Sequence, residues 1–306
     1  MPKQPKPGRP VIFGEVLFDQ FPDGSKVLGG APFNVAWHLR GFGLNPLLAS
    51  RIGSDDAGQE VLMRMRDWGL AVQGIQIDTE YPTGVVQIEL QQGQPVYSIV
   101  ADQAYDFISY ALLKSCIGQQ AISFIYHGSL ATRSAISRAT LKQIIDGCRA
   151  LRFIDINLRT PWWDKQSIDK LIGDAYWLKL NDQELAELTG MDSIDAQERE
   201  AEASLLLGQY SLETLVLTEG ERGACIISQS DTVCGASAAV ENVQDTVGAG
   251  DAFSAVCLLG YSQGWADEII LKRALEFAAN ICEFRGATPD DSQLYSDYLM
   301  RWMNHS

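Results

Sequence analysis

Short apolar runs alternate with amphipathic stretches through the first quarter of the chain. Apolar runs at 11–13, 47–52 and 72–77 are separated by stretches at 31–42 and 56–68 whose apolar residues recur at helical spacing. This alternation of strand and helix signals predicts a mostly parallel sheet with helices on its faces.

Two segments depart from this alternation and indicate antiparallel hairpins. Residues 84–90 and 95–100 are apolar runs joined by a polar turn, and a second, shorter hairpin surrounds the turn sequence PDGS at 22–25. We expect the segments 15–30 and 83–101 to form a small four-stranded sheet, a lid inserted in the main domain.

The remaining signals return to alternation and extend almost to the end of the chain. Further strands are expected at 121–126, 153–156, 175–180, 215–218, 223–228 and 232–234. Further helices are expected at 132–148, 183–188, 196–209, directly after Asp251, 268–284 and 292–302. Because no repeat, low-complexity linker or long charge block divides the chain, residues 1–306 are predicted to form a single α/β domain.

Composition excludes some classes of partner. The 306 residues carry a formal charge of −15, which argues against a nucleic-acid or anionic-membrane partner. No segment approaches the ~20 apolar residues of a membrane helix, and the start MPKQPKPGRP lacks the apolar region of a secretory signal. We therefore expect a cytoplasmic protein.

Cysteine and histidine spacing gives no sign of a metal site. The six cysteines include no C-x-x-C pair and several lie in apolar runs, so we predict buried thiols and not disulfides or metal ligands. The three histidines, His38, His127 and His305, are also too scattered for a metal site.

The stretch DTVGAGDAF at 245–253 is a tight loop that opens into an apolar helix. Gly248, Ala249 and Gly250 are small enough for an anion to approach the unpaired N–H groups of a helix start. A carboxylate at this place repels a phosphate, so we predict that Asp251 is a base that deprotonates a hydroxyl attacking phosphorus. The alternative is a helix-capping Asp251 behind a simple glycine turn.

Three stretches in order resemble the signatures of the ribokinase-like, or PfkB, family of carbohydrate kinases. GGAPFNVA at 29–36, continued at 41–43 and 51–58, is similar to the N-terminal signature. NDQE at 181–184 and DTVGAGDAF at 245–253 are similar to the N-x-x-E motif and the C-terminal signature. The resemblance covers essentially the whole chain after residue 10. It implies a three-layer ribokinase-like fold with a small β-sheet lid over the sugar.

The resemblance also implies roles for single residues. Asp251 is expected to be the catalytic base, and the N–H groups from Gly248 through Ala249 and Gly250 to Asp251 the anion hole. Sugar contacts are expected from Asp19, Gly30, Asn34 and Arg159, and contacts on the nucleotide side from Asn181, Glu184, Thr218, Gly220, Gly223 and Asn280. Glu184 is expected to hold Mg²⁺ through water, and K⁺ is expected at Asp245, Val247 and Gly286.

Structural alternatives stay open for several of these residues. Asn181 also suits a helix N-cap, and Asp19 an exposed strand position. Arg159 is equally suited to a salt bridge with a carboxylate, and Asn280 to a packing or surface role. The stretch 218–223 has the pattern of an ordinary hairpin turn.

Gly14, Glu15 and Asp19 ahead of the GGAPxNVA stretch resemble fructokinases more than ribokinases. We predict an ATP-dependent kinase that phosphorylates a primary hydroxyl of a ketohexose, with D-fructose as first candidate and ATP, Mg²⁺ and K⁺ as cofactors. The alternatives are ribose, 2-keto-3-deoxygluconate or a nucleoside as substrate, and a non-catalytic sugar- or protein-binding pseudo-kinase. The apolar hairpin at 84–100 further suggests a homodimer through the lid, and the alternative is a monomer whose lid covers its own edge.

Overall fold

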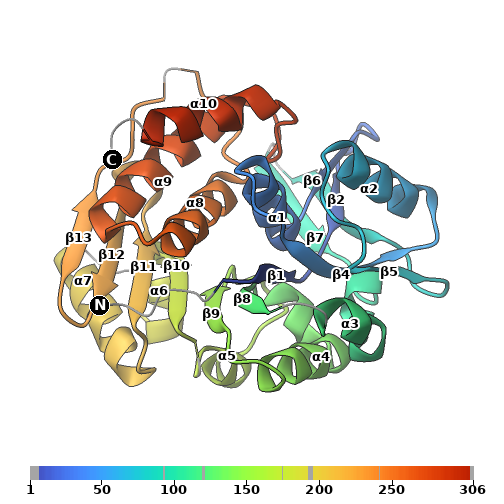
Figure 1. The fold of residues 1–306 in the computed structure, drawn as a ribbon, viewed down its shortest axis with the longest axis horizontal. Helices are drawn as coiled ribbons and strands as arrows, with labels where there is room; N and C mark the ends of the chain where they lie inside the picture. The colour runs from blue at the N-terminus through green and yellow to red at the C-terminus, as the bar shows by residue number, and fades with distance from the viewer. Residues whose placement is uncertain are drawn as a thin grey trace.

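The structure is a computed structural model that describes residues 7–91, 94–118, 121–173, 175–191, 196–240 and 242–303. Within these ranges the chain forms a large and a small sheet, and helices cover both faces of the large one (Figure 1). The predicted fold class, a three-layer α/β fold with a mostly parallel sheet, is confirmed.

The large sheet has the strand order β13-β12-β11-β10-β9-β8-β1-β4-β5. Its strands are parallel from β11 to β5, and β12 and β13 extend one edge in antiparallel fashion. Buried parallel strands are near-continuous apolar runs, so charged residues such as Asp155 and Lys179 stand out in them. The bounds are β1 Arg9–Phe13, β4 Leu47–Gly53, β5 Ile75–Asp78, β8 Ile122–His127, β9 Leu151–Asp155, β10 Trp177–Asn181, β11 Thr214–Thr218, β12 Ala224–Ser228 and β13 Thr232–Gly235.

Two sets of helices pack on the opposite faces of this sheet (Figure 1). One face carries α1 Ala31–Gly41, α2 Asp56–Asp67, α8 Ala249–Gln263, α9 Asp267–Ile281 and α10 Ser292–Met303. The other face carries α3 Tyr110–Ile117, α4 Ala135–Asp146, α5 Lys165–Ile172, α6 Asp182–Thr189 and α7 Ala196–Gln209. No helix of the described residues is both long and apolar enough to span a membrane.

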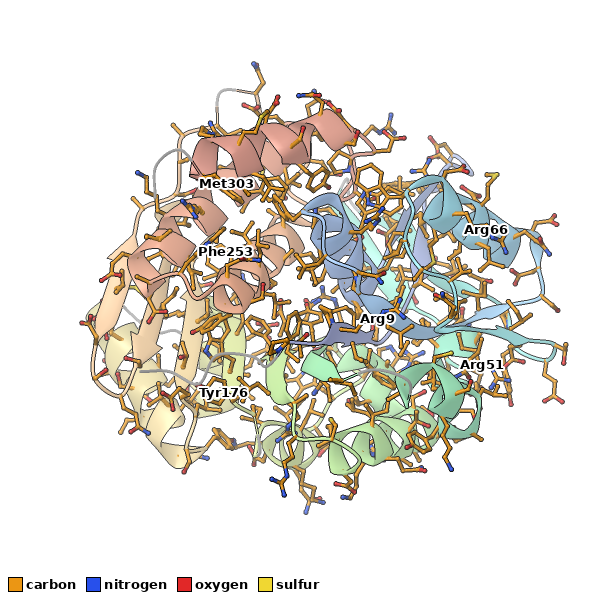
Figure 2. The ribbon with its side chains drawn as sticks, viewed as in Figure 1. Arg9, Arg51, Arg66, Tyr176, Phe253 and Met303 are labelled. Carbon is orange, nitrogen blue, oxygen red and sulfur yellow. A yellow bond between two sulfur atoms is a disulfide. The ribbon has the colours of Figure 1, made fainter. Side chains whose placement is uncertain are left out.

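Helix α8 is deeply buried along most of its length, because its residues from Ala252 to Gly260 are all buried. It packs between α1 and α9. Figure 2 shows Phe253 of α8 inside the molecule, whereas Arg66 and Met303 lie at its periphery. Because α8 is anchored along its length, its first turn is held in a defined position above the sheet.

The small sheet has the order β3-β2-β6-β7, with β2 Leu17–Gln20, β3 Lys26–Gly29, β6 Gly84–Gln91 and β7 Gln94–Ile99. Its strands come from the two segments that depart from the alternating pattern. Strand β2 pairs parallel to β6 and antiparallel to β3. Leu17 and Val86 pack into the same core cluster as Phe13 of β1, so the small sheet rests on the end of the large one.

Two helices and one covalent link differ from the sequence expectations. Helices α3 and α5 were not predicted, because each has eight residues and buries only one or two of them, too few to give a helical period. The expectation of free thiols is wrong for Cys225 and Cys234, which form a disulfide. These residues face each other across β12 and β13, and this pairing depends on a strand register that cysteine spacing does not reveal.

The other four cysteines are free thiols. His38 and His127 are buried and hydrogen-bonded, to the Tyr295 hydroxyl and the Gly128 carbonyl respectively. His305 lies outside the described residues.

Candidate active site

A cavity of about 580 Å³ opens where the carboxyl ends of β9, β10 and β11 meet the small sheet and the start of α8. In open α/β sheets, ligands bind at this edge of the strands. Most of the predicted site residues line the cavity: Asp19, Gly30, Asn34, Arg159, Asn181, Glu184, Thr218, Val247, Gly248, Gly250 and Asp251.

The first turn of α8 presents free backbone donors to this cavity. Gly248 adopts φ 84° as the N-cap, and a Cβ there would lie 2.2 Å from the Cβ of Ala287. Among the described residues no acceptor lies in reach of the N–H groups of Gly248, Gly250 and Asp251, whereas that of Ala249 lies 3.4 Å from the Thr246 carbonyl. Three donors at the positive end of a 15-residue helix form a site suited to an anion.

The Asp251 carboxylate lies beside these donors. Burial raises its pKa to about 7, because the effect of burial and of nearby Asp155 outweighs the Asn34 hydrogen bond and the charges of Lys179 and Arg159. Its Oδ2 accepts a hydrogen bond from Asn34 Nδ2 at 2.7 Å. A carboxylate with such a pKa is a competent proton acceptor near neutral pH.

Asn34 holds Asp251 in place and keeps an acceptor for a ligand. Its side chain is buried, and its Oδ1 has no hydrogen-bond partner among the described residues. A buried amide oxygen without a donor is costly, so a ligand hydroxyl that donates to it is expected to bind favourably.

A buried ion pair that the sequence analysis missed lies under the first turn of α8. Lys179 Nζ donates to Asp155 Oδ2 at 2.7 Å, and Ser254 Oγ donates to the same oxygen at 2.9 Å. Burial lowers the pKa of Lys179, but the Asp155 carboxylate and the nearby Glu184 and Asp251 raise it by more, so the pKa lies above its usual value. The ammonium group therefore stays charged.

Lys179 also lies close to the anion site. A Cβ built on Gly250 would be 3.6 Å from its Nζ, so its positive charge adds to that of the helix start. The signal that was overlooked is a lysine inside the apolar strand WLKLN, since lysine is almost never fully buried unless it is paired.

Asn181 and Glu184 form a capping box at the start of α6. Asn181 Oδ1 accepts from the Glu184 N–H, and Glu184 Oε2 accepts from the Asn181 N–H, both at 2.8 Å. Glu184 Oε1 accepts from the Leu158 N–H, also at 2.8 Å, and burial together with Asp155 raises the pKa of Glu184. Because each oxygen already holds one N–H, Glu184 suits a cation that keeps its waters, as Mg²⁺ does.

Two acidic side chains, Asp19 and Glu15, line the cavity near the small sheet. Burial raises the pKa of Asp19 on β2 to about 6, although Arg159 opposes this effect. It raises the pKa of Glu15 to about 7, and Glu15 Oε2 has no hydrogen-bond partner among the described residues. Glu15 was not selected as a site residue from sequence, because it lies in a short irregular segment between β1 and β2.

Gly30 and Arg159 complete this side of the cavity. Gly30 adopts φ 108°, and a Cβ there would approach the Glu15 carbonyl oxygen to 2.8 Å, so only glycine fits. Arg159 is exposed, donates to the Leu158 carbonyl, and has no carboxylate within ion-pair distance in the described ranges. Its guanidinium is therefore available to a ligand.

The predicted nucleotide residues are only partly brought together. Thr218 ends β11 at the cavity, and Gly220 and Gly223, with φ 59° and 117°, shape the turn η3 Gly220–Arg222 beside it. Asn280 on α9 does not line this cavity, and its Nδ2 donates to Glu283.

The three residues predicted to hold K⁺ lie together. Asp245 Oδ1 accepts from the Val247 N–H at 3.0 Å, and Asp245 Oδ2 accepts from the Gly286 N–H at 3.2 Å. We call residues 245–250, which lead into the first turn of α8, the anion loop. A carboxylate among loop residues at the base of the anion loop fits a hard cation with oxygen ligands.

Comparisons with known proteins identify the family of this chain. The family model of the pfkB family carbohydrate kinases matches residues 10–293. Fructokinase-1 of Oryza sativa subsp. japonica is 28% identical, with 89% of each chain covered.

Solved structures share the fold. A fructokinase of Vibrio cholerae O395 with fructose, ADP and calcium superposes with a TM-score of 0.77 at 23% identity, over 95% of this chain and 98% of the other. Its double mutant with fructose, ADP and potassium also gives 0.77, at 22% identity over 97% and 100%. A fructokinase of Xylella fastidiosa with bound ATP gives 0.79 at 20% identity, over 96% and 98%. The chain belongs to the pfkB family of carbohydrate kinases.

Proposed function

We propose that this sugar kinase transfers the γ-phosphoryl group of ATP to a primary hydroxyl of D-fructose. One observation carries the proposal: the Asp251 carboxylate and the free N–H groups of the first turn of α8 border the same cavity. A base beside an anion site is what phosphoryl transfer to an alcohol requires. Fructose is favoured because related chains are named fructokinases and the Vibrio cholerae structures hold fructose with ADP.

The proposed reaction begins with the sugar hydroxyl against Asp251. Asp251 takes the hydroxyl proton as the oxygen forms its bond to the γ-phosphorus, and the bond to the β-phosphate oxygen breaks, so that ADP leaves with the electron pair. Asn34 holds the base through its 2.7 Å hydrogen bond. A positioned base typically contributes ~10²–10⁴-fold to the rate.

The charge of the transferring phosphoryl group is stabilised from two directions. The N–H groups of Gly248, Gly250 and Asp251 point from the helix start, and the Lys179 ammonium lies behind Gly250. Donors placed before the reaction cost no reorganisation during it, and removal of one such donor typically costs ~10²–10³-fold in kcat. Arg159 is proposed to contact the substrate from the exposed rim.

Two cations fit residues of this site. Mg²⁺, held through water near Glu184 and Asn181, would screen the charge of the ATP phosphates. K⁺ at Asp245, Val247 and Gly286 would keep the anion loop in its present shape, and potassium is present in one Vibrio cholerae structure. Glu15 and Asp19, with Asn34 Oδ1, are proposed to accept hydrogen bonds from the sugar hydroxyls.

The lid role of the small sheet and a dimer through it are further parts of the proposal. Leu17, Val86 and Ile99 of the small sheet line the cavity, so this sheet forms one of its walls. Tyr97 of β7 is 55% exposed beside the cavity. A second copy that covers the free edge of the sheet would bury it.

The test is a coupled ADP-release assay with Mg·ATP and K⁺ across D-fructose, ribose, 2-keto-3-deoxygluconate and a nucleoside. We expect kcat/KM for fructose to exceed that for each other acceptor by at least ~10-fold, a difference of ~1.4 kcal/mol. A preference for another acceptor would contradict the fructose assignment, but the assignment of the phosphoryl-transfer site would stand. Binding of fructose without turnover of any acceptor would instead favour a pseudo-kinase.

A further inference from the structure

A second cavity, of about 780 Å³, borders the turn at 129–133 next to the candidate active site. It is bordered by α4, α5 and the segment 161–164, and Ser129 lines both cavities. Helices α4 and α5 lie side by side in Figure 1. A hollow of this volume suits a small molecule and not an extended polymer.

Positive charge is concentrated on the walls of this second cavity. The chain as a whole has 39 acidic and 24 basic residues. Five basic side chains line the cavity against two carboxylates: Arg133, Arg138, Lys142, Arg152 and Lys170 against Asp146 and Asp164. A local excess of cations in an acidic protein favours an anionic ligand.

Not all of these cations are neutralised within the protein. Lys142 pairs with Asp146 at 2.7 Å. In the part of the chain that the structure describes, the Arg138 guanidinium donates only to the Thr132 carbonyl, and Lys170 has no ion pair. Two exposed cations without carboxylate partners match the charge of about −2 of a phosphate group near neutral pH.

Aromatic surface completes the second cavity. Trp162 and Trp163 line it, and the Arg133 guanidinium lies 4.2 Å from the centre of the Trp162 ring. Indole rings offer an apolar surface for the body of a small metabolite, beside the cations that would bind its anionic group.

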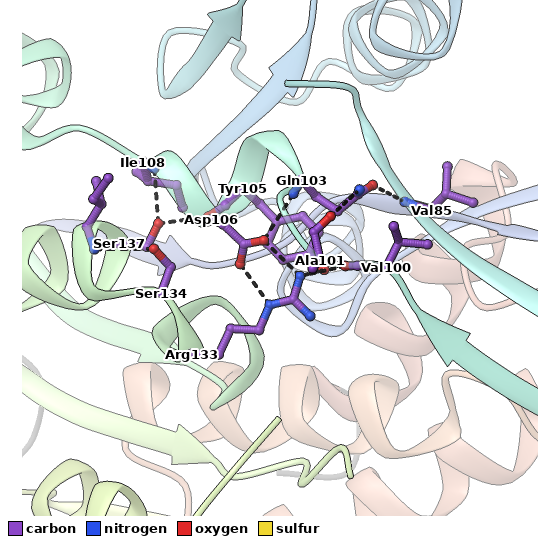
Figure 3. Close-up of polar contacts among 11 residues, drawn as sticks. Val85, Val100, Ala101, Gln103, Tyr105, Asp106, Ile108, Arg133, Ser134 and Ser137 are labelled. Carbon is purple, nitrogen blue, oxygen red and sulfur yellow. Dashed lines mark hydrogen bonds and ion pairs between the residues drawn. The ribbon is translucent and has the colours of Figure 1, made fainter. Parts of the chain in front are cut away.

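Arg133 lines the second cavity, and its hydrogen bonds to residues near the small sheet are drawn in Figure 3. Its guanidinium forms two hydrogen bonds of 2.8 Å to Asp106 and one of 2.7 Å to the carbonyl of Val100, which directly follows β7. Asp106 accepts from the Gln103 N–H, and Gln103 Oε1 accepts from the N–H of Val85 on β6. A ligand against Trp162 would therefore touch the arginine that ties down the base of the small sheet.

We infer that the second cavity binds a phosphate dianion, free or carried by a small metabolite, and that its occupancy shifts the small sheet through Arg133. The ligand binds with its phosphate between Arg138 and Lys170 and its body against Trp162 and Trp163. Binding is independent of the proposed function, whereas an effect on turnover rests on it.

The experiment is isothermal titration calorimetry with inorganic phosphate and with D-glucose 6-phosphate, in the presence of saturating ADP and fructose to fill the candidate active site. We expect saturable binding with one site per chain. The double variant Arg138→Gln, Lys170→Gln removes two exposed charges and is expected to weaken binding at least about tenfold. The matched control is Lys165→Gln on the same helix α5, since Lys165 lies outside the lining and pairs with Asp169.

The two probes distinguish the source of the phosphate. Tighter binding of glucose 6-phosphate than of inorganic phosphate supports an esterified ligand in contact with the indoles, and equal or tighter binding of phosphate supports the free ion. Equal affinity of the double variant and the Lys165→Gln control for both probes would overturn the site.

The coupling has its own measurement. Hydrogen exchange of the β6 amides at 84–89 is expected to slow when glucose 6-phosphate or phosphate binds, because Val85 belongs to the network of Arg133. This readout needs no turnover, so it separates failure of the coupling from failure of the proposed kinase activity. Binding without any change in β6 exchange would overturn the coupling.

Discussion

Replacement of Asp251 by Asn is expected to stabilise the ligand-free protein at alkaline pH. Burial raises the pKa of Asp251 from the 3.8 of a free side chain to about 7. Between these values the folded protein keeps a proton that the unfolded chain has released. Raising the pH therefore favours the unfolded state, and the free energy of unfolding falls until the pH passes about 7.

The size of the effect follows from the same pKa values. A rise from 3.8 to about 7 corresponds to a penalty of at most ~4 kcal/mol at pH 8. Between pH 5 and pH 8 the penalty grows by ~2–3 kcal/mol, and water in the cavity reduces it. Asn has almost the same shape, and its side-chain oxygen accepts the same hydrogen bond from Asn34, so the variant loses the penalty without losing the contact.

Urea unfolding of the ligand-free wild type and Asp251→Asn, followed by tryptophan fluorescence at pH 5, 6.5 and 8, measures this difference. We expect the advantage of the variant to increase with pH and to level off above pH 7. Asp19 and Glu15, which have raised pKa values too, are present in both proteins, so the comparison isolates Asp251. A pH-independent difference between the two proteins, or a wild type that is more stable at pH 8, would refute the reasoning.

Three further predictions concern the surroundings of the site. Lys179→Met leaves a buried carboxylate without its cation and should cost ~3–5 kcal/mol of unfolding free energy in urea titrations; unchanged stability would show that the pair is not buried in solution. Gly248→Ala should lower kcat/KM about a hundredfold, because the added methyl group displaces the anion loop. The control Gly43→Ala, at φ 83° but in open space, should leave kcat/KM intact. Equal losses in the two variants would contradict this reasoning. Reduction of the Cys225–Cys234 disulfide, whose cysteines are nine residues apart, should lower the free energy of unfolding in urea titrations by ~2–3 kcal/mol. If the double variant Cys225→Ser, Cys234→Ser loses as much stability on addition of reductant, the loss does not come from this disulfide.

Local patterns predicted those parts of the site that are local in sequence. The loop before α8 is visible from small residues followed by an apolar run, and Gly248 is the N-cap of α8, in a left-handed conformation that favours glycine. The capping role left open for Asn181 is confirmed, because the partner is three residues away. The roles of Asp251 as base and of Glu184 toward Mg²⁺ stay predictions.

Features that depend on register between distant segments were not predicted. Lys179 becomes important because β10 lies beside β9, where its partner Asp155 ends the strand. Likewise Cys225 meets Cys234 only through the pairing of β12 with β13. Asn280 on α9 does not line the cavity, and its expected contact with the nucleotide stays a prediction.

The most direct test of the account is a rapid-quench measurement of phosphoryl transfer from radiolabelled ATP in wild type and Asp251→Asn, with fructose binding measured in parallel by calorimetry. The account predicts that the variant binds fructose with similar affinity and transfers phosphate ~10²–10⁴-fold more slowly, the range expected when a positioned base is lost. Transfer at the wild-type rate by Asp251→Asn would contradict the assignment of Asp251 as the base.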